Sequence, residues 1–224
     1  MRERAVDKGR MEQRAVQLSI GAVTLEGYLH IPPKARGMVI FAHGSGSSRN
    51  SPRNLYVARA LNKAGLATLL PDLLTAKEEA EDDLTARLRF DISLLASRLV
   101  GATDWLSKNA STMNFNVGYF GASTGAAVAI VAAAERPKIK AIVSRGGRPD
   151  LAKSALSLVK APTLLIVGGE DDVVIGLNQR AYDQLGAEKE LVVIPGATHL
   201  FEEPGTLEEV AQLASNWFTK HFGG

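Results

Sequence analysis

Short apolar runs alternate along the chain with longer stretches whose apolar positions recur at helical spacing. Uninterrupted apolar runs are typical of strands buried on both faces of a sheet, and apolar positions three and four apart mark one face of a helix. This alternation favours an α/β fold in which helices cover both faces of a mostly parallel sheet of about seven to eight strands. The expected strands are 15–20, 23–31, 38–42, 67–70, 117–120, 141–144, 163–167 and 191–194.

The first two expected strands differ from the others because a tight turn joins them. Gly21 and Ala22 separate them, which predicts an antiparallel pair. The last expected helix begins at Thr206, and Glu209 three positions later predicts a capping box there. The expected helices are 52–64, 85–109, 123–135 and 206–221.

A G-x-S-x-G motif stands where an expected strand meets an expected helix. Residues 121–125 read Gly-Ala-Ser-Thr-Gly, directly after the strand at 117–120. A sharp strand-to-helix turn of this kind, a nucleophile elbow, exposes the serine hydroxyl above the sheet. The alternative is a small-residue turn with no chemistry, but the context favours Ser123 as a nucleophile.

A serine hydroxyl needs an adjacent base to take its proton. His199 follows the last expected strand and precedes the last helix, which places it at the same edge of a parallel sheet as Ser123. His43 is expected to pack and form hydrogen bonds within its own loop. His199 is therefore the predicted general base.

The base in turn needs an acid that orients its ring. The loop after the strand at 163–167 reads Gly-Gly-Glu-Asp-Asp and offers three carboxylates. Its spacing from the strand end favours Asp171. Asp172 is the alternative, and Glu170 competes with both.

Backbone N–H groups are also required, because the reaction develops a negative charge on oxygen. The N–H of Thr124, directly after the nucleophile, is one expected donor to this oxyanion. The other is expected from Ser45, in the Gly/Ser-rich loop after the strand at 38–42. Gly44 and Gly46 flank Ser45 and are expected to leave space for the substrate.

Four arginines follow the same strand ends. Arg49 and Arg53 lie beyond the Gly/Ser-rich loop, and Arg145 and Arg148 follow the strand at 141–144. Arginine forks suit carboxylate and phosphate groups, so Arg49 and Arg145 are candidates for binding an anionic substrate. The alternative interpretation is that these arginines are solvated loop charges.

Composition narrows the possible functions. The 224 residues include 26 basic and 24 acidic side chains, a net charge of +2 without a basic stripe, which argues against a nucleic-acid partner. The absence of cysteine excludes disulfides and cysteine nucleophiles. Residues 1–13 are expected to be a polar leader rather than a secretory signal, and 14–224 one domain. A cytoplasmic protein without a membrane span is expected, and no oligomeric state is indicated.

The chain resembles the α/β-hydrolase superfamily, and within it serine-nucleophile proteins related to dienelactone hydrolase. The resemblance extends from about residue 15 to the C-terminus and rests on FAHGSGSS (41–48), GYFGASTG (118–125), LLIVGGEDDVVI (164–175) and VIPGATHLFEEPGTLEEV (193–210). It implies an α/β-hydrolase fold with Ser123, Asp171 and His199 at the triad positions, and Ser45 and Thr124 at the oxyanion positions. Dienelactone hydrolases themselves use a cysteine, so their name does not indicate a lactone substrate here.

The expected activity is hydrolysis of an ester-like bond in a small molecule, through an acyl-enzyme on Ser123 and without cofactor or metal. Ester, thioester, lactone and amide substrates stay open. The alternatives are a catalytically inactive binding protein and an acyltransferase that uses the same residues. Many α/β-hydrolases carry a lid after the strand that corresponds to 141–144. The 18 residues at 145–162 are too few for a lid domain, which predicts an open pocket for small substrates.

Overall fold

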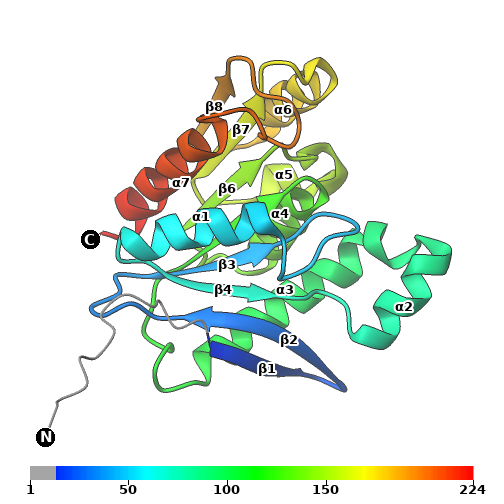
Figure 1. Cartoon of the computed structure of the whole chain (residues 1–224), viewed down its shortest axis with the longest axis vertical. Coiled ribbons are helices and arrows are strands. Elements are labelled where there is room, and N and C mark those ends of the chain that lie inside the picture. The colour runs from blue at the N-terminus through cyan, green and yellow to red at the C-terminus, as the bar shows by residue number, and fades with distance from the viewer. Residues whose placement is uncertain (1–13, 224) are drawn as a thin grey trace, which may run out of the picture.

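A computed structural model describes residues 14–223, and the expected leader at 1–13 lies outside this range. Within it, eight strands form one sheet in the order β1-β2-β4-β3-β5-β6-β7-β8 (Figure 1). The strands are β1 (Arg14–Ile20), β2 (Val23–His30), β3 (Met38–Ala42), β4 (Ala67–Pro71), β5 (Val117–Ala122), β6 (Ala141–Arg145), β7 (Thr163–Gly168) and β8 (Lys189–Ile194). β1 with β2 and β2 with β4 are antiparallel, and all other neighbouring pairs are parallel.

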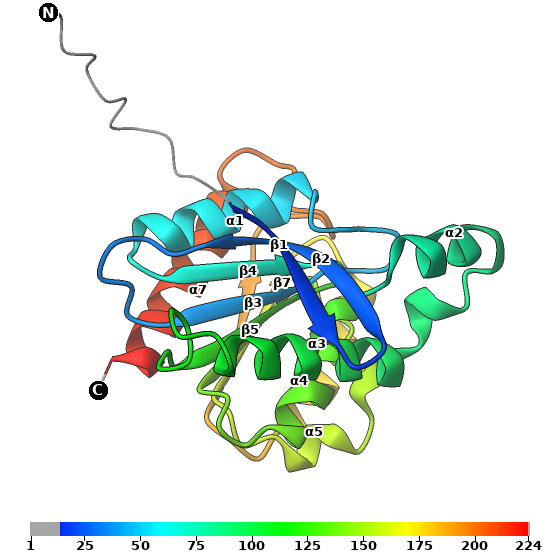
Figure 2. The ribbon, with the colours of Figure 1, turned by 90° about the horizontal axis from the view of Figure 1, so that it is seen from below.

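Helices cover both faces of the sheet, as the alternating pattern predicted. They are α1 (Pro52–Lys63), α2 (Ala76–Thr85), α3 (Ile92–Ser107), α4 (Thr124–Glu135), α5 (Ala155–Leu158), α6 (Asp172–Gln184) and α7 (Thr206–Phe222), with 3-10 turns η1 (Leu88–Phe90) and η2 (Pro149–Ala152). α1 and α7 pack together on one face, while α3 and α4 lie on the other (Figure 2).

β3 is apolar at every position because both of its faces meet a helix layer. In β3, Met38 and Ile40 belong to the core on the α3 and α4 side. Val39 and Phe41 belong to the core on the α1 and α7 side. All four are buried, so the continuous apolar run reflects two cores that share one strand.

The helix expected at 85–109 is wrong at its start. α2 ends at Thr85, and its C-cap residue Ala86 has a φ of 52°. α3 begins only after Asp91, whose carboxylate accepts the N–H of Leu94 at 2.9 Å. The buried carboxylate of Asp82 accepts the N–H of Leu88 at 2.6 Å, which stabilises the intervening turn. This local hydrogen bonding competes with helix formation, so the expected helix begins only at Ile92.

The capping box expected at Thr206 is also wrong. Gly205, with φ of 86°, occupies the N-cap of α7, and no side chain caps the helix there. The Thr206 hydroxyl instead donates to the carbonyl of Glu203 at 2.8 Å. A box does form at α2, where Thr75 and Glu78 bond each other's backbone N–H.

Two further features bear on what the molecule can bind. The β6–β7 connection holds only η2 and the four-residue α5, so no lid domain is inserted there. Among residues 14–223, no helix has the length and apolarity that crossing a bilayer requires.

Candidate active site

Ser123 occupies a sharp turn between β5 and α4. Its φ of 52° and ψ of −121° lie in a region that non-glycine residues rarely adopt, and such strain is frequent at functional sites. The turn requires small neighbours, because a Cβ on Gly125 would overlap the carbonyl of Ala42 and one on Gly121 would overlap Ala126. The predicted elbow is therefore present.

His199 lies between Ser123 and Asp171. Its Nε2 is 3.3 Å from the Ser123 hydroxyl oxygen, and its Nδ1 is 2.7 Å from Oδ2 of Asp171. The three residues come from the loops after β5, β7 and β8, at the carboxyl edge of the parallel strands. Of the three loop acids, the structure brings Asp171 to the imidazole, and Asp172 beside it is exposed.

Backbone hydrogen bonds hold the acid and histidine loops together. The N–H of Gly169 donates to the carbonyl of Ile194 at 2.8 Å, and the N–H of Glu170 donates to that of Ala197 at 3.0 Å. Within the histidine loop, the Thr198 hydroxyl donates to Glu203 at 2.6 Å. These bonds hold the chain both before and after His199, and so fix the position of its imidazole.

The two residues expected to bind an oxyanion lie next to each other. The N–H of Ser45 donates to the hydroxyl oxygen of Thr124 at 2.8 Å, across 79 positions of sequence. Gly44 approaches closely, since a Cβ there would lie 3.1 Å from Cβ of Ser123. The Gly/Ser-rich loop is thus tied to the start of α4 beside Ser123.

His43 has a structural role in the same loop, as expected. Its Nε2 accepts the N–H of Leu73 at 3.1 Å, and its Nδ1 lies 3.0 Å from the carbonyl of Gly44. Burial lowers the pKa of His43, so the ring is neutral at pH 7. It orders the loop that carries Gly44 and Ser45.

A cavity of about 210 Å³ opens beside Ser123. It is lined by Gly44, Ser45, Ser47, Ser51, Arg53, Asn54, Ala122, Ser123, Arg145, His199 and Leu200. Of the four residues expected to contact the substrate, Gly46 and Arg49 are not part of this lining, and neither are Thr124 and Asp171. Arg49 instead forms ion pairs with Asp72 and Glu26.

Sequence reasoning missed the contribution of the start of α1. Ser51 and Asn54 line the cavity, and Ser51 caps α1 by accepting the Asn54 N–H at 3.4 Å. The dipeptide Ser51-Pro52 was the available signal, because serine at the N-cap followed by proline marks a helix start.

Arg145, a predicted candidate for anion binding, lines the same cavity. Its residue surface is only 6% exposed, and burial with a contribution from nearby Arg53 lowers its pKa to about 10. The guanidinium lies over the Phe201 ring, 5.9 Å from the ring centre. The interpretation of Arg145 as a solvated loop charge therefore fails.

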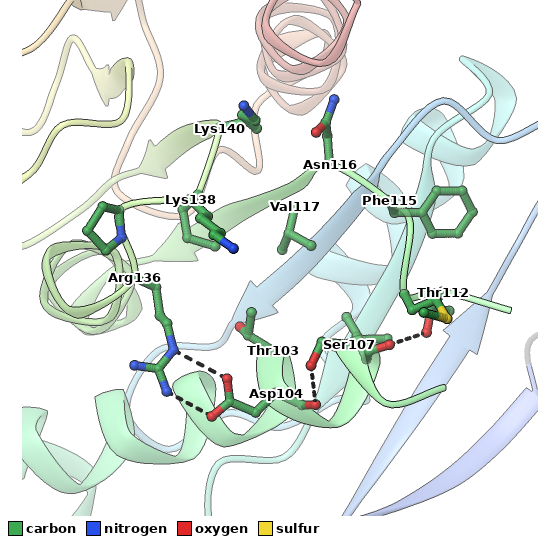
Figure 3. Close-up of a pocket in the computed structure, with 14 residues that line it drawn as sticks. Thr103, Asp104, Ser107, Thr112, Phe115, Asn116, Val117, Arg136, Lys138 and Lys140 are labelled. Atoms are coloured by element: carbon green, nitrogen blue, oxygen red, sulfur yellow. Dashed lines mark hydrogen bonds and ion pairs between the residues drawn. The ribbon is translucent and has the colours of Figure 1, made fainter. Parts of the chain in front are cut away.

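A larger cavity, of about 740 Å³, lies at the other end of the parallel strands, near the amino ends of β5 and β6. Figure 3 shows its lining, where Val117 begins β5 and Arg136 reaches Asp104 through two hydrogen bonds of 3.3 and 2.8 Å. Lys138 and Lys140 also line it, in the connection between α4 and β6. None of the predicted site residues lines this cavity.

Comparisons with known proteins identify the family and the fold. The family model described as "Dienelactone hydrolase family" matches residues 25–222. A crystal structure of dienelactone hydrolase from Anabaena variabilis is 64% identical, with a TM-score of 0.92 over 94% of this chain and 98% of that chain. Est1E from Butyrivibrio proteoclasticus, 19% identical with a TM-score of 0.77 over 94% of this chain and 99% of that one, shares the fold.

A longer curated relative comes from Mycobacterium tuberculosis strain H37Rv and bears the name "Putative phosphoribosyl transferase Rv0571c". It is 57% identical over 215 residues, which are 96% of this chain and 48% of the relative. The chain therefore spans about half the length of the curated relative it matches. With the family match over 25–222 and the eight-stranded fold, the chain belongs to the dienelactone hydrolase family of α/β-hydrolases.

Proposed function

We propose that this protein is a serine hydrolase that cleaves an ester-like bond through an acyl-enzyme on Ser123. The observation that carries the proposal is the continuous contact from Asp171 through His199 to the Ser123 hydroxyl, beside a cavity. Nucleophile, base and orienting acid in this arrangement form the standard apparatus of acyl transfer from serine.

In the first step, the Ser123 oxygen attacks the substrate carbonyl carbon while His199 Nε2 takes the hydroxyl proton. Asp171, beside Nδ1, holds the ring in orientation and stabilises the imidazolium that forms. Collapse of the tetrahedral intermediate expels the leaving group, which receives the proton from His199. A water molecule then attacks the acyl-enzyme, with His199 again as base, and releases the acid.

The N–H groups of Ser45 and Thr124 are the proposed donors to the oxyanion. In the structure the Ser45 N–H bonds the Thr124 hydroxyl at 2.8 Å, so binding a tetrahedral intermediate requires this N–H to exchange one oxygen acceptor for another. An oxyanion is the stronger acceptor, because hydrogen bonds to charged groups are roughly twice as strong as neutral ones.

The name of the Mycobacterium tuberculosis relative does not describe this site. That protein is about twice as long as the part matched here, so we assign the phosphoribosyl transferase name to its unmatched half. The matched half carries the hydrolase fold, and the serine apparatus argues for acyl chemistry.

A panel of p-nitrophenyl esters and thioesters tests the proposal. The small cavity and the missing lid predict higher kcat/KM for acetyl and butyryl esters than for decanoyl esters. Ser123→Ala should lower kcat by about 10⁴-fold or more while leaving the circular dichroism spectrum unchanged. Release of free acid, rather than transfer to an added alcohol, separates hydrolysis from acyl transfer. Turnover that persists in Ser123→Ala contradicts the proposal.

A further inference from the structure

Arg145 is a buried guanidinium without a counter-ion in the described part of the chain. No carboxylate in residues 14–223 pairs with it, and its Nε has no hydrogen-bond partner there. Its contact with the Phe201 ring offsets only part of the lost hydration. Buried charges in proteins are normally paired, so an unpaired arginine that lines a cavity indicates a missing anionic partner.

A second guanidinium lies close by. Arg53, from the first turn of α1, lines the same cavity, and its Nε is also buried without a partner among the described residues. Its Nη1 pairs with Glu202 at 2.9 Å, but the Glu202 side chain is 64% exposed. Water screens such a pair and leaves it weak, so Arg53 is available to a ligand.

The third side of the cavity is the amino end of α1. This helix has twelve residues and no acidic side chain in its first turn. Pro52 has no N–H, and the N–H groups of Asn54 and Leu55 bond Ser51, so among the described residues the N–H of Arg53 and the positive end of the helix dipole remain for a ligand. Ser45, Ser47 and Ser51 add hydroxyls to the lining. Because Ser51 accepts the Asn54 N–H, its own hydrogen is free to donate.

We propose that this cavity binds the phosphate group of a phosphomonoester substrate, between Arg145, Arg53 and the amino end of α1. A carboxylate offers two oxygens in one plane, whereas a phosphate monoester offers three arranged around phosphorus and therefore suits donors on three sides. Its charge of about −1.5 to −2 at pH 7 balances two guanidiniums. As a statement about substrate, the inference rests on the proposed function, since it places the scissile ester of the same small molecule at Ser123.

Binding of inorganic phosphate to the whole chain tests the site without requiring turnover. Isothermal titration and thermal melts should show equal phosphate affinity in the wild type and in Ser123→Ala. Arg145→Met should raise the dissociation constant by about tenfold or more, because it removes charge-assisted hydrogen bonds. Arg148→Gln is the matched control, since Arg148 pairs with Asp150 and does not line the cavity.

Arg145→Met should also melt at a higher temperature than the wild type in phosphate-free buffer, because it removes an uncompensated buried charge. Added phosphate should then raise the melting temperature of the wild type but not of this variant. Arg53→Gln gives an independent loss of affinity if Arg145→Met does not fold. Unchanged phosphate binding in either folded variant overturns the inference.

Competition separates phosphate from other anions. At equal ionic strength, phosphate should inhibit hydrolysis of p-nitrophenyl acetate more strongly than acetate or succinate does. Stronger inhibition by a carboxylate overturns the assignment to phosphate, and absence of phosphate binding by titration overturns the site. If Ser123→Ala binds phosphate but the wild type hydrolyses no ester, the proposed function fails while the anion site stands.

Discussion

Asp171 and Asp172 are adjacent carboxylates whose surroundings separate their roles. Asp171 lies 2.7 Å from His199 Nδ1 and is partly shielded from solvent, whereas Asp172 begins α6 and is exposed. The sequence favoured Asp171 by spacing but left Asp172 open, because neither composition nor spacing shows which way a loop carboxylate points.

Replacing each of these acids in turn measures this difference. Asp171→Asn should lower kcat by about 10⁴-fold, since the amide cannot hold the imidazole in its reactive tautomer. Asp172→Asn should keep kcat within about twofold, because Asp171 is the acid that contacts His199 and substitutions of exposed side chains such as Asp172 usually disturb the fold little. Steady-state kinetics on one ester substrate decides, and equal losses in both variants contradict the assignment.

His43, which orders the Gly/Ser-rich loop, should make the free energy of unfolding depend on pH. Burial lowers its pKa below the ordinary 6.5, so below about pH 6.5 the unfolded chain binds a proton that the folded chain does not. The unfolded state then holds more protons, and the free energy of unfolding falls as the pH falls, by up to about 1.4 kcal/mol per pH unit. Urea unfolding between pH 7.5 and 5.5 should show this loss.

His43→Gln keeps an acceptor for the Leu73 N–H but cannot titrate in this range. Its unfolding free energy should therefore vary less with pH than that of the wild type. His221→Gln measures the separate contribution of a second histidine, because burial also lowers the pKa of His221, at the far end of α7. A pH dependence identical to the wild type in His43→Gln would argue against a role for this ring.

The burial of Arg145 could not be predicted from the residues around it in the sequence. It follows an apolar strand in a Gly-rich stretch, which is how a solvated loop charge also looks. Its guanidinium lies over the ring of Phe201 in the histidine loop, more than fifty positions later in the chain. Local pattern carries no information about which distant segment covers a side chain.

At the scale of elements, strands were predicted more reliably than helices. All eight expected strands are present. The central strands carry apolar runs that meet helix layers on both faces, whereas β1 and β2 turn every second residue inward and are joined by a tight turn. α2 was not predicted, and the helix expected from residue 85 begins only at Ile92, because the hydrogen bonds of Asp82 and Asp91 that separate α2 from α3 are contacts of single side chains. The amino end of α1 was located, but its place at the cavity was not.

The packing of α4 against β3 fixes the height of Ser123 above the sheet. Gly125→Ala should destabilise the fold by about 3 kcal/mol, because the added methyl group meets the Ala42 carbonyl in a backbone that cannot yield easily. Gly186→Ala is the control, since a methyl group added there would have no other atom within 4 Å and the residue is exposed. Chemical denaturation of both variants gives the comparison. Equal free energies of unfolding for the two variants would show that a methyl group at residue 125 does not disturb the turn at Ser123.

At the scale of the whole molecule, one sheet carries two cores. Trp105 of α3 packs against one core, and Trp217 of α7 belongs to the other. The two helices lie on opposite faces of the sheet (Figure 2). We expect the predicted domain at 14–224 to unfold as one unit, since the strands between these layers contribute side chains to both.

Single-tryptophan variants test whether the two cores unfold together. Trp105→Phe leaves Trp217 as the fluorescent reporter, and Trp217→Phe leaves Trp105. Within each variant, tryptophan fluorescence and far-ultraviolet circular dichroism should give the same urea midpoint, as two-state unfolding requires. A fluorescence midpoint that differs from the circular dichroism midpoint within one variant would show that the two layers unfold separately.

The parallel strands bring Ser123, Asp171 and His199 to one edge of the sheet, and the central claim is that this edge makes Ser123 a nucleophile. Labelling with a fluorophosphonate, followed by peptide mass spectrometry, tests the claim most directly. The account predicts one adduct, on Ser123 of the folded wild type, that is lost in Ser123→Ala and strongly slowed in His199→Gln. A folded wild-type protein that stays unlabelled, or an adduct on another residue, would contradict it.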